Sequence, residues 1–273
     1  MGAVIATNTA ANTALVYLNK NIDQQSSSLA KISSGSRIVT ASDDAAGLAV
    51  GTGLRADAAI LKQAAVNTAN SRAVLNVADG GLAQISNILE RQAVLAAQSA
   101  SGTVDDNARG FIDAEFQALQ NEINAIESAV TFNGAALLDG TFNENTLVGV
   151  NAADLIALDL SGINVDTTSL GSNAAAVGTN ANAVTAIGLV NTAIDTVVGY
   201  RADVGALQSR FGFRGDVVAV AVDNTEDAAS AILDVNIAEE QTNLTNKQVL
   251  TEAAIAGLSQ ANQLTQSLLS LIQ

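Results

Sequence analysis

The stretch "ANTALVYLNKNIDQQSSSLAKI", residues 11–32, carries its apolar side chains in a heptad pattern. The repeated positions are spaced alternately by four and three residues: Ala11, Leu15, Leu18, Ile22, Gln25, Leu29 and Ile32. Such a narrow seam is typical of a helix that pairs with another helix, whereas a helix lying on a globular core shows a wider apolar stripe. The pattern therefore predicts a long N-terminal helix with a helical partner.

The C-terminal end of the chain repeats this spacing. The repeated positions there are Leu250, Ala254, Gly257, Ala261, Leu264, Leu268 and Leu271. A helix with only a thin seam is marginally stable in water, so we expect the two ends to pack on each other or on neighbouring molecules. The small residues Ala254, Gly257 and Ala261 would let helix backbones approach closely. Two ordinary amphipathic helices within one domain remain the alternative.

The composition favours long helices in thin layers. The chain has 273 residues, of which 48% are hydrophobic, and it contains two Tyr, six Phe, no Trp and no Pro. Without proline, very long helices are permitted. We expect helices over residues 42–101, 107–129 and from about 180 to the C-terminus, with the first helix ending at the Ser-Ser-Gly of "ISSGSRIVT", residues 32–40.

The region between about 131 and 180 has a different character, with Asn, Gly, Thr and Asp between short apolar runs. The runs "TLVGV" (146–150) and "LIALDL" (155–160) predict a β-hairpin. The predicted fold is therefore mainly α: the chain runs out as helices, turns through a small β-rich region and returns as helices.

Several classes of function are excluded by what the chain lacks. It has no Cys and no His, which excludes thiolate chemistry and Ser-His-Asp catalysis. The formal charge is −15, and no Lys or Arg occurs between Arg109 and Arg201, so we do not expect a nucleic-acid partner. We also expect no signal peptide, because the N-terminus lacks early positive charge, and no membrane insertion, because no window approaches about 20 apolar residues.

Adjacent acidic residues raise the question of a catalytic or metal site. Sequence neighbours on a helix point about 100° apart and do not converge on one atom. For "SDD" at residues 42–44, we expect Ser42 to cap a helix whose first turn contains Asp43 and Asp44, where each carboxylate interacts with the positive end of the helix dipole.

Two further motifs have ordinary explanations. "GTGLRA", residues 51–56, matches the glycine fingerprint of dinucleotide sites but lies inside a predicted helix, so we interpret it as two helix glycines that permit close packing. Asp154, Asp159 and Asp166 lack the spacing of a calcium-binding loop. We therefore predict no catalytic, cofactor-binding or metal-binding residues, no cofactor, and no enzyme activity.

Five stretches, in this order, give the chain a family resemblance: "LAKISSGSRIVTASDDAAGLAV", "ERQAVLAAQSASGT", "TFNGAALLDG", "RADVGALQSRF" and "LSQANQLTQSLLSLIQ". Over nearly its whole length the chain resembles bacterial flagellin. The resemblance implies a terminal coiled coil, D0, over residues 1–42 and 231–273. It also implies a helical bundle, D1, over residues 43–230, with a β-hairpin insert around 131–180 and no outer domains.

The resemblance also implies a function and its residues. The expected function is that of a flagellar filament subunit, a propeller component exported unfolded through the type III apparatus and placed outside the cell. The polymerisation seams would be Leu15, Leu18, Ile22, Leu29, Ile32, Leu250, Ala254, Ala261, Leu264, Leu268 and Leu271. The D0–D1 junction would contain Gly35, Arg37, Ser42, Asp43 and Asp44. The expected partners are further copies of the chain, other flagellins, an export chaperone, the filament cap and hook-junction proteins.

The sequence leaves two alternatives and two departures from the family. A hook–filament junction protein shares the terminal coiled-coil plan, and an adhesion or polysaccharide-binding homologue would expose the same surface. The chain keeps Arg91, Leu95 and Glu115 of a region recognised by the animal flagellin receptor, but Ala93 and Val94 replace the usual Arg-Glu. Near the C-terminus Ala231 and Asn236 replace Arg and Asp beside Asp234, which predicts the loss of a local ion pair.

Overall fold

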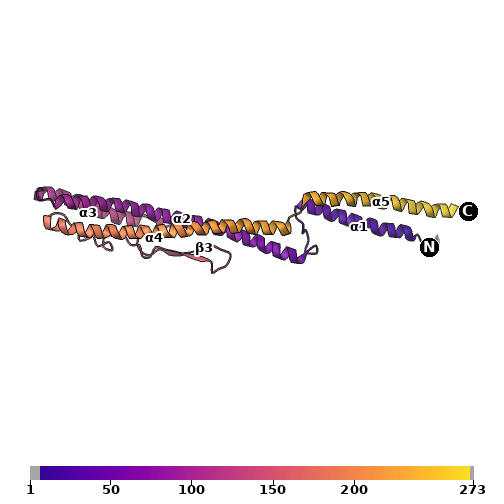
Figure 1. The fold of residues 1–273 in the computed structure, drawn as a ribbon, viewed down its shortest axis with the longest axis horizontal. Helices are drawn as coiled ribbons and strands as arrows, with labels where there is room; N and C mark the ends of the chain where they lie inside the picture. The colour runs from indigo at the N-terminus through magenta and orange to yellow at the C-terminus, as the bar shows by residue number, and fades with distance from the viewer. Residues whose placement is uncertain (1–6, 271–273) are drawn as a thin grey trace. The chain divides into compact units, whose positions relative to one another are not determined.

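The computed structural model describes residues 7–270, and of residues 268–270 it describes the backbone alone. Its elements, in chain order, are α1 (Thr9–Ser34), α2 (Ala45–Ser99), α3 (Asp106–Ala129), β1 (Thr131–Phe132), β2 (Ala135–Ala136), β3 (Asn143–Leu147), β4 (Leu155–Asp159), α4 (Asn180–Leu233) and α5 (Ile237–Ser270). Figure 1 shows these elements as a ribbon. The prediction of a mainly α protein with a small β region is confirmed.

The chain forms two compact units. The bundle unit is Asp57–Asp223, and the terminal unit contains the described residues up to Ala56 and from Asn224 onward. The helices α2 and α4 contribute residues to both units, because each is more than 50 residues long and contains no proline to interrupt it. We describe each unit by itself.

The core of the bundle unit is organised by strict heptads that the sequence analysis did not identify. On α2 every third and fourth residue in turn is buried: Leu61, Ala64, Thr68, Ser71, Leu75, Ala78, Leu82, Ile85, Leu89, Gln92, Ala96 and Ser99. On α4 the buried residues recur every seven positions: Ala183, Val190, Val197, Val204, Phe211 and Val218. Phe116 and Ile123 of α3 complete the core beside them, and Figure 1 shows α2, α3 and α4 running side by side in this unit.

Two β-hairpins connect α3 to α4. The β1–β2 pair turns at Asn133 and Gly134, which both have positive φ, as a tight two-residue hairpin requires. The β3–β4 pair is the predicted hairpin, and its buried residues Ile156 and Leu158 alternate with exposed ones. The first strand lies at 143–147, three residues before the predicted 146–150, because exposed polar residues of an edge strand gave no apolar signal.

Among the described helices, α4 is long and apolar enough, by length and composition, to cross a membrane. This finding differs from the sequence prediction, which found no such window. Within the bundle unit the apolar residues of α4 have protein partners, since Val190, Val197 and Val204 are completely buried in the core.

In the terminal unit, α1 and α5 pack against each other in antiparallel orientation. The side chain of Asn8, which caps α1, donates a hydrogen bond to the carbonyl of Ala261 near the end of α5. At the other end of the pair, the amide of Val235 donates to the carbonyl of Gly35. The predicted terminal helix pair is therefore present in the folded chain.

The helical region expected from residue 180 onward is divided into α4 and α5 at residues 234–236. Neither glycine nor proline marks this break in the sequence. The break ends at Asn236, which is the N-cap of α5: its Oδ1 accepts hydrogen bonds from the amides of Ala238 and Glu239 at 3.2 and 3.4 Å.

Candidate subunit interface

The contact between α1 and α5 is lined by small and polar side chains. Buried or half-buried positions form one row along α1, Ala11, Ala14, Leu18, Asn21, Gln25, Ser28 and Ile32, and one along α5, Leu244, Lys247, Thr251, Ala254, Leu258, Ala261 and Thr265. We call these two rows the inner seam. Both rows alternate by three and four residues, as in a coiled coil. The inner seam buries few large apolar side chains, so the pair gains little from the hydrophobic effect.

The large apolar side chains of α1 lie beside the inner seam and are exposed. Leu15, Ile22 and Leu29, spaced seven residues apart, are 41, 47 and 57% exposed. They form one stripe along the helix, because residues seven apart lie on the same face. We call it the α1 outer stripe. Of the predicted heptad positions in α1, Ala11, Leu18, Gln25 and Ile32 lie in the inner seam, so that Leu18 and Ile32 are the predicted polymerisation residues of α1 found there.

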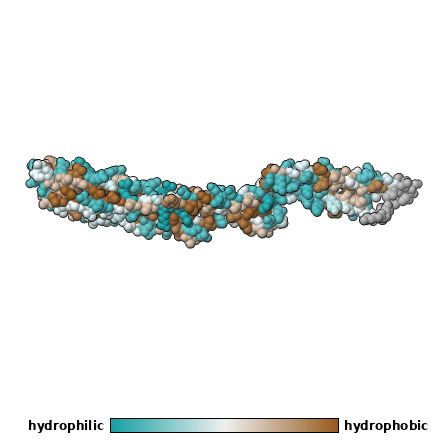
Figure 2. Space-filling model, in the orientation of Figure 1, coloured by the Kyte–Doolittle hydropathy of each residue, from teal (hydrophilic) through white to brown (hydrophobic). Residues whose placement is uncertain are grey.

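The predicted seam of α5 divides in the same way. Ala254 and Ala261 lie in the inner seam, whereas Leu250 and Leu264 are 48 and 56% exposed and form the α5 outer stripe. Gly257 lies between Leu250 and Leu264 in the heptad. A side chain at Gly257 would meet nothing within 4 Å in this chain, so Gly257 is not a point of close packing between α1 and α5. The Leu268 side chain and Leu271 lie outside the described residues. Figure 2 shows apolar residues at the surface of the helix pair, among hydrophilic ones.

The predicted junction residues Gly35 and Arg37 form a backbone clasp with the α4–α5 break. Gly35 ends α1 in the left-handed conformation with φ 70°, which glycine adopts without steric cost. The amide of Arg37 donates to the carbonyl of Leu233 at 2.6 Å, and the hydroxyl of Ser36 donates to the same carbonyl at 3.1 Å. The clasp therefore connects the segment after α1 to the segment between α4 and α5 in the terminal unit.

The start of α2 corrects the predicted role of Ser42. Asp44 is the N-cap, because its Oδ1 accepts a hydrogen bond from the amide of Gly47 at 2.8 Å and the helix begins at Ala45. Asp43 lies before the helix. The amides of Thr40 and Val39 donate to its Oδ2 and lower the pKa of the carboxyl. The Ser42 hydroxyl bonds only with the Thr40 hydroxyl in this turn.

Close to the clasp, Asp234 has a cationic partner that the sequence analysis missed. Arg55 Nη2 lies 3.2 Å from Asp234 Oδ1, and the hydroxyl of Ser230 donates to the other carboxylate oxygen at 2.7 Å. The predicted loss of an ion pair through Ala231 and Asn236 therefore leaves Asp234 paired. Because both side chains are at least half exposed, the pair contributes at most about 1 kcal/mol.

The three residues of the predicted receptor region occupy different environments in the bundle unit. Arg91 of α2 donates two hydrogen bonds to Glu115 Oε1 of α3, at 2.9 and 2.7 Å. Leu95 is 1% exposed and belongs to the core. Of the three, only Arg91 and Glu115 offer side chains to a partner, and the recognition itself stays a prediction.

No group of three or more acidic residues is placed to hold a metal ion within residues 7–270. The acidic pairs that raised this question have local roles at helix starts, as Asp105 shows by accepting from the amide of Ala108 at the beginning of α3. A pair of helices, α1 and α5, that packs through a thin seam and exposes large apolar side chains is typical of a structural protein that assembles with further copies.

Comparison with known proteins identifies the family. The family model described as "Bacterial flagellin N-terminal helical region" matches residues 5–143, and that described as "Bacterial flagellin C-terminal helical region" matches residues 187–272. The chain belongs to the bacterial flagellins.

Relatives and solved structures agree with this assignment. A flagellin of Halalkalibacterium halodurans is 34% identical, with 93% of each chain covered. The "Flagellar filament 33 kDa core protein" of Treponema phagedenis is 35% identical, over 100% of this chain and 98% of its own. The crystal structure of Bacillus cereus flagellin is 30% identical with a TM-score of 0.50, covering 56% of this chain and 88% of that one.

Proposed function

We propose that this flagellin polymerises into the bacterial flagellar filament by burying its two outer stripes against neighbouring copies. The observation that supports the proposal is the exposure of Leu15, Ile22, Leu29, Leu250 and Leu264 next to a seam of small and polar residues. Flagellar filament core proteins of two Treponema species are similar to almost the whole chain.

Estimates of burial energy indicate that the α1–α5 helix pair is weakly stable in the free subunit and is stabilised further by assembly. Complete burial of a Leu or Ile side chain stabilises by about 1.5–3 kcal/mol, so covering a half-exposed one contributes on the order of 1 kcal/mol. The five outer-stripe residues together can therefore stabilise assembly by several kcal/mol per subunit. A contact between copies whose rotation does not close produces an open helical polymer rather than a ring.

The finer assignments are also proposals. We assign residues 1–42 and 231–273 to the terminal coiled coil D0, and residues 43–230 to D1. We further propose that the chain is exported to the cell exterior and meets an export chaperone, the filament cap and hook-junction proteins on its way. The hook–filament junction role is not favoured, because the relatives are named as flagellins and filament core proteins. Nothing in the described residues favours a polysaccharide-binding role.

Seeded elongation tests the proposal. Purified chain should elongate filament seeds, and Ile22→Asp or Leu250→Asp should stop elongation, because each places a charge in an outer stripe. Ser27→Asp is the matched control: it adds the same charge to an exposed position of α1 away from both the inner seam and the outer stripe, and should elongate seeds like the wild type. Failure of the wild-type chain, or normal elongation by Ile22→Asp, would refute the proposal.

Truncation gives an independent test. Removal of residues 1–30 or 250–273 should leave a soluble bundle unit that retains its helical circular dichroism, since its core lies within Asp57–Asp223. Neither truncated chain should polymerise. Elongation by either one would show that the terminal helices are dispensable.

A further inference from the structure

The stretch "TFNGAALLDG", residues 131–140, contains the single Asn-Gly pair of the chain, Asn133–Gly134, and shortly after it an Asp-Gly pair, Asp139–Gly140. In both pairs the glycine has positive φ, 83° at Gly134 and 77° at Gly140. An asparagine followed by glycine is the dipeptide most prone to deamidation, because glycine has no side chain to hinder the attack of its amide on the neighbouring carboxamide. The surroundings of each pair therefore decide whether such chemistry is available in the folded chain.

The Asn133–Gly134 pair is open to this reaction. The two residues form the tip of the β1–β2 hairpin, and both are exposed. Within residues 7–270 neither the side chain of Asn133 nor the amide of Gly134 makes a hydrogen bond, and a side chain on Gly134 would meet nothing within 4 Å. The carboxamide and the glycine amide are therefore free to approach each other.

The hairpin tip also holds Asn133 only weakly. Asn133 has a φ of 49°, a region that costs energy for a residue with a side chain. Only two residue pairs hold the hairpin, Thr131 with Ala136 and Phe132 with Ala135, and short two-stranded hairpins are marginally stable. The tip can therefore leave this conformation at a small cost and reach the one in which the ring closes.

The Asp139–Gly140 pair is fixed by its neighbours. Asp139 Oδ1 accepts hydrogen bonds from the amide of Thr141 at 2.9 Å and from its hydroxyl at 2.8 Å. A backbone bridge joins Asp139 to Asn164, and a Cβ on Gly140 would lie 3.2 Å from the Cβ of Asn164. A side chain at position 139 is therefore held toward Thr141, and the glycine after it is crowded.

We infer that Asn133 is a deamidation site of the folded chain. The amide nitrogen of Gly134 attacks Asn133 Cγ, the Cγ–Nδ2 bond breaks, and ammonia leaves with the proton of the Gly134 amide. Water then adds across one of the two C–N bonds of the resulting cyclic imide. Opening at Cγ gives aspartate, and opening at the main-chain carbonyl gives isoaspartate, which has an extra methylene group in the main chain. Water is the only co-reactant, and polymerisation is not required.

The two products affect the turn differently. Aspartate tolerates positive φ as asparagine does, so it keeps the hairpin and adds one negative charge. Isoaspartate lengthens the main chain within a two-residue turn, so Phe132 and Ala135 cannot keep their register. Leu137 and Leu138 follow directly and are completely buried. The isoaspartate product should therefore unfold at a lower temperature than the unmodified chain.

Peptide mass spectrometry of the full-length chain tests the inference. During incubation of the folded chain in a mildly alkaline buffer, the peptide that contains Asn133 should gain the mass of an acid in place of an amide before any other asparagine-containing peptide. Isoaspartyl methyltransferase should label part of this product. The chain unfolded in guanidinium chloride at the same pH gives the reference rate. A faster reaction at another asparagine of the folded chain would overturn the inference, as would an intact Asn133 when the unfolded chain has reacted.

The variant Asp139→Asn is the matched control, because it places a second Asn-Gly pair in the same molecule. The carboxamide oxygen at position 139 can accept the same hydrogen bonds from Thr141, so circular dichroism should match the wild type. In the folded variant, position 139 should deamidate at least about tenfold more slowly than position 133, whereas the two rates should be similar in guanidinium chloride. Equal rates in the folded variant would overturn the conclusion that the open turn selects Asn133.

Discussion

The helices α1 and α3 have nearly the same length, 26 and 24 residues, but they use their apolar residues in opposite ways. In α3 the side chains of Ile112, Phe116 and Ile123 are buried in the core of the bundle unit. In α1 the buried positions are Ala11 and Ser28, and the large apolar side chains of Leu15, Ile22 and Leu29 are exposed. The bundle unit therefore buries a core of large apolar residues within one chain, even though it also exposes some, such as Phe111. The terminal helix pair buries few large apolar side chains of its own.

This difference accounts for a subunit that must be both soluble and able to polymerise. A helix pair with a complete apolar seam would be stable alone and would have little to gain from neighbours. A pair with a thin inner seam is marginal alone, and its ordering can be coupled to assembly, because binding stabilises the ordered state. The bundle unit, with its heptads on α2 and α4, supplies stability that does not depend on assembly.

The largest expected effect is in the bundle core. Phe116→Ala should lower the free energy of unfolding by about 3–5 kcal/mol, because it leaves a cavity at a fully buried aromatic. Urea unfolding followed by far-ultraviolet circular dichroism measures the change. Leu29→Ala removes a residue that is 57% exposed on α1, and it should leave the main unfolding transition within about 0.5 kcal/mol of wild type. Equal losses in the two variants would contradict the contrast between the units.

The next effect concerns two glycines of α2 that lie two residues apart in the terminal unit. A Cβ on Gly51 would lie 2.5 Å from Leu233 Cγ, and Leu233 is itself buried, whereas a Cβ on Gly53 would meet nothing within 4 Å. Gly51→Ala should destabilise by roughly 1–3 kcal/mol through overpacking. Gly53→Ala should stabilise by up to about 1 kcal/mol through helix propensity. Thermal unfolding of both variants measures the signs, and the same sign for both would be inconsistent with close packing at Gly51.

The glycines also show how far the sequence could predict the fold. A nucleotide site at "GTGLRA" could be excluded because the sequence predicts a helix around it. Which of the two glycines packs closely could not be predicted, because it depends on Leu233, 182 residues after Gly51. The helices, the end of α1 at Gly35 and the β3–β4 hairpin followed from periodicity and turn residues. The division at residues 234–236 did not, because no glycine or proline marks it and because it depends on the backbone clasp with residues 35–37 as well as on the Asn236 cap.

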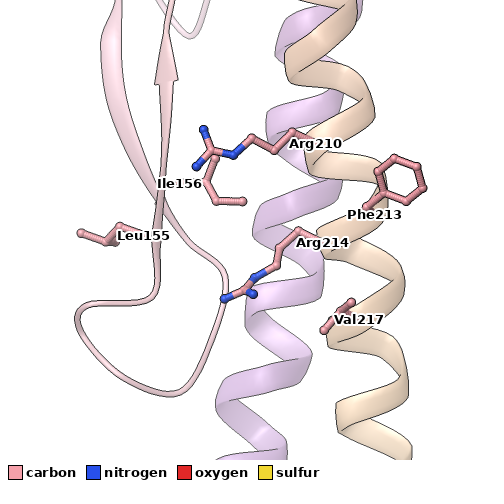
Figure 3. A pocket seen from close by; sticks show the side chains of 6 residues that line it. All are labelled: Leu155, Ile156, Arg210, Phe213, Arg214 and Val217. Carbon is pink, nitrogen blue, oxygen red and sulfur yellow. The ribbon is translucent and has the colours of Figure 1, made fainter.

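The candidate interface was predictable in part. A heptad pattern identifies the apolar face of a helix, but Leu15 and Ala14 lie on adjacent strips, and the larger residue suggested the wrong one for the contact with α5. Polar residues such as Asn21 and Ser28 gave no apolar signal for the inner seam. A groove in the bundle unit, lined by Arg210 and Arg214 among other residues (Figure 3), was not predictable, because it needs the β3–β4 hairpin to lie beside α4.

A substitution in the inner seam should reduce the difference in stability between the α1–α5 helix pair and the bundle unit. Gln25→Leu places an apolar side chain in the inner seam and should stabilise the helix pair by about 1–2 kcal/mol. Hydrogen exchange of α1 amides in the free subunit should slow by about tenfold, the factor that corresponds to 1.4 kcal/mol. Ser27→Leu adds the same side chain at an exposed position of α1 and should leave exchange nearly unchanged. Equal protection in both variants would show that the inner seam does not limit the stability of the pair.

The smallest expected effect tests which residue begins α2. Asp44→Ala should destabilise the terminal unit by about 1 kcal/mol, because the amide of Gly47 loses its acceptor and a negative charge leaves the positive end of the helix dipole. Ser42→Ala removes only a hydroxyl contact with Thr40 in an exposed turn and should change stability by less than about 0.5 kcal/mol. Thermal unfolding of the two variants distinguishes them, since a larger loss for Ser42→Ala would restore Ser42 as the cap. Because residues 35–44 connect α1 to α2, loss of the Asp44 cap should also speed hydrogen exchange in the first turn of α2 while leaving exchange in α3 unchanged.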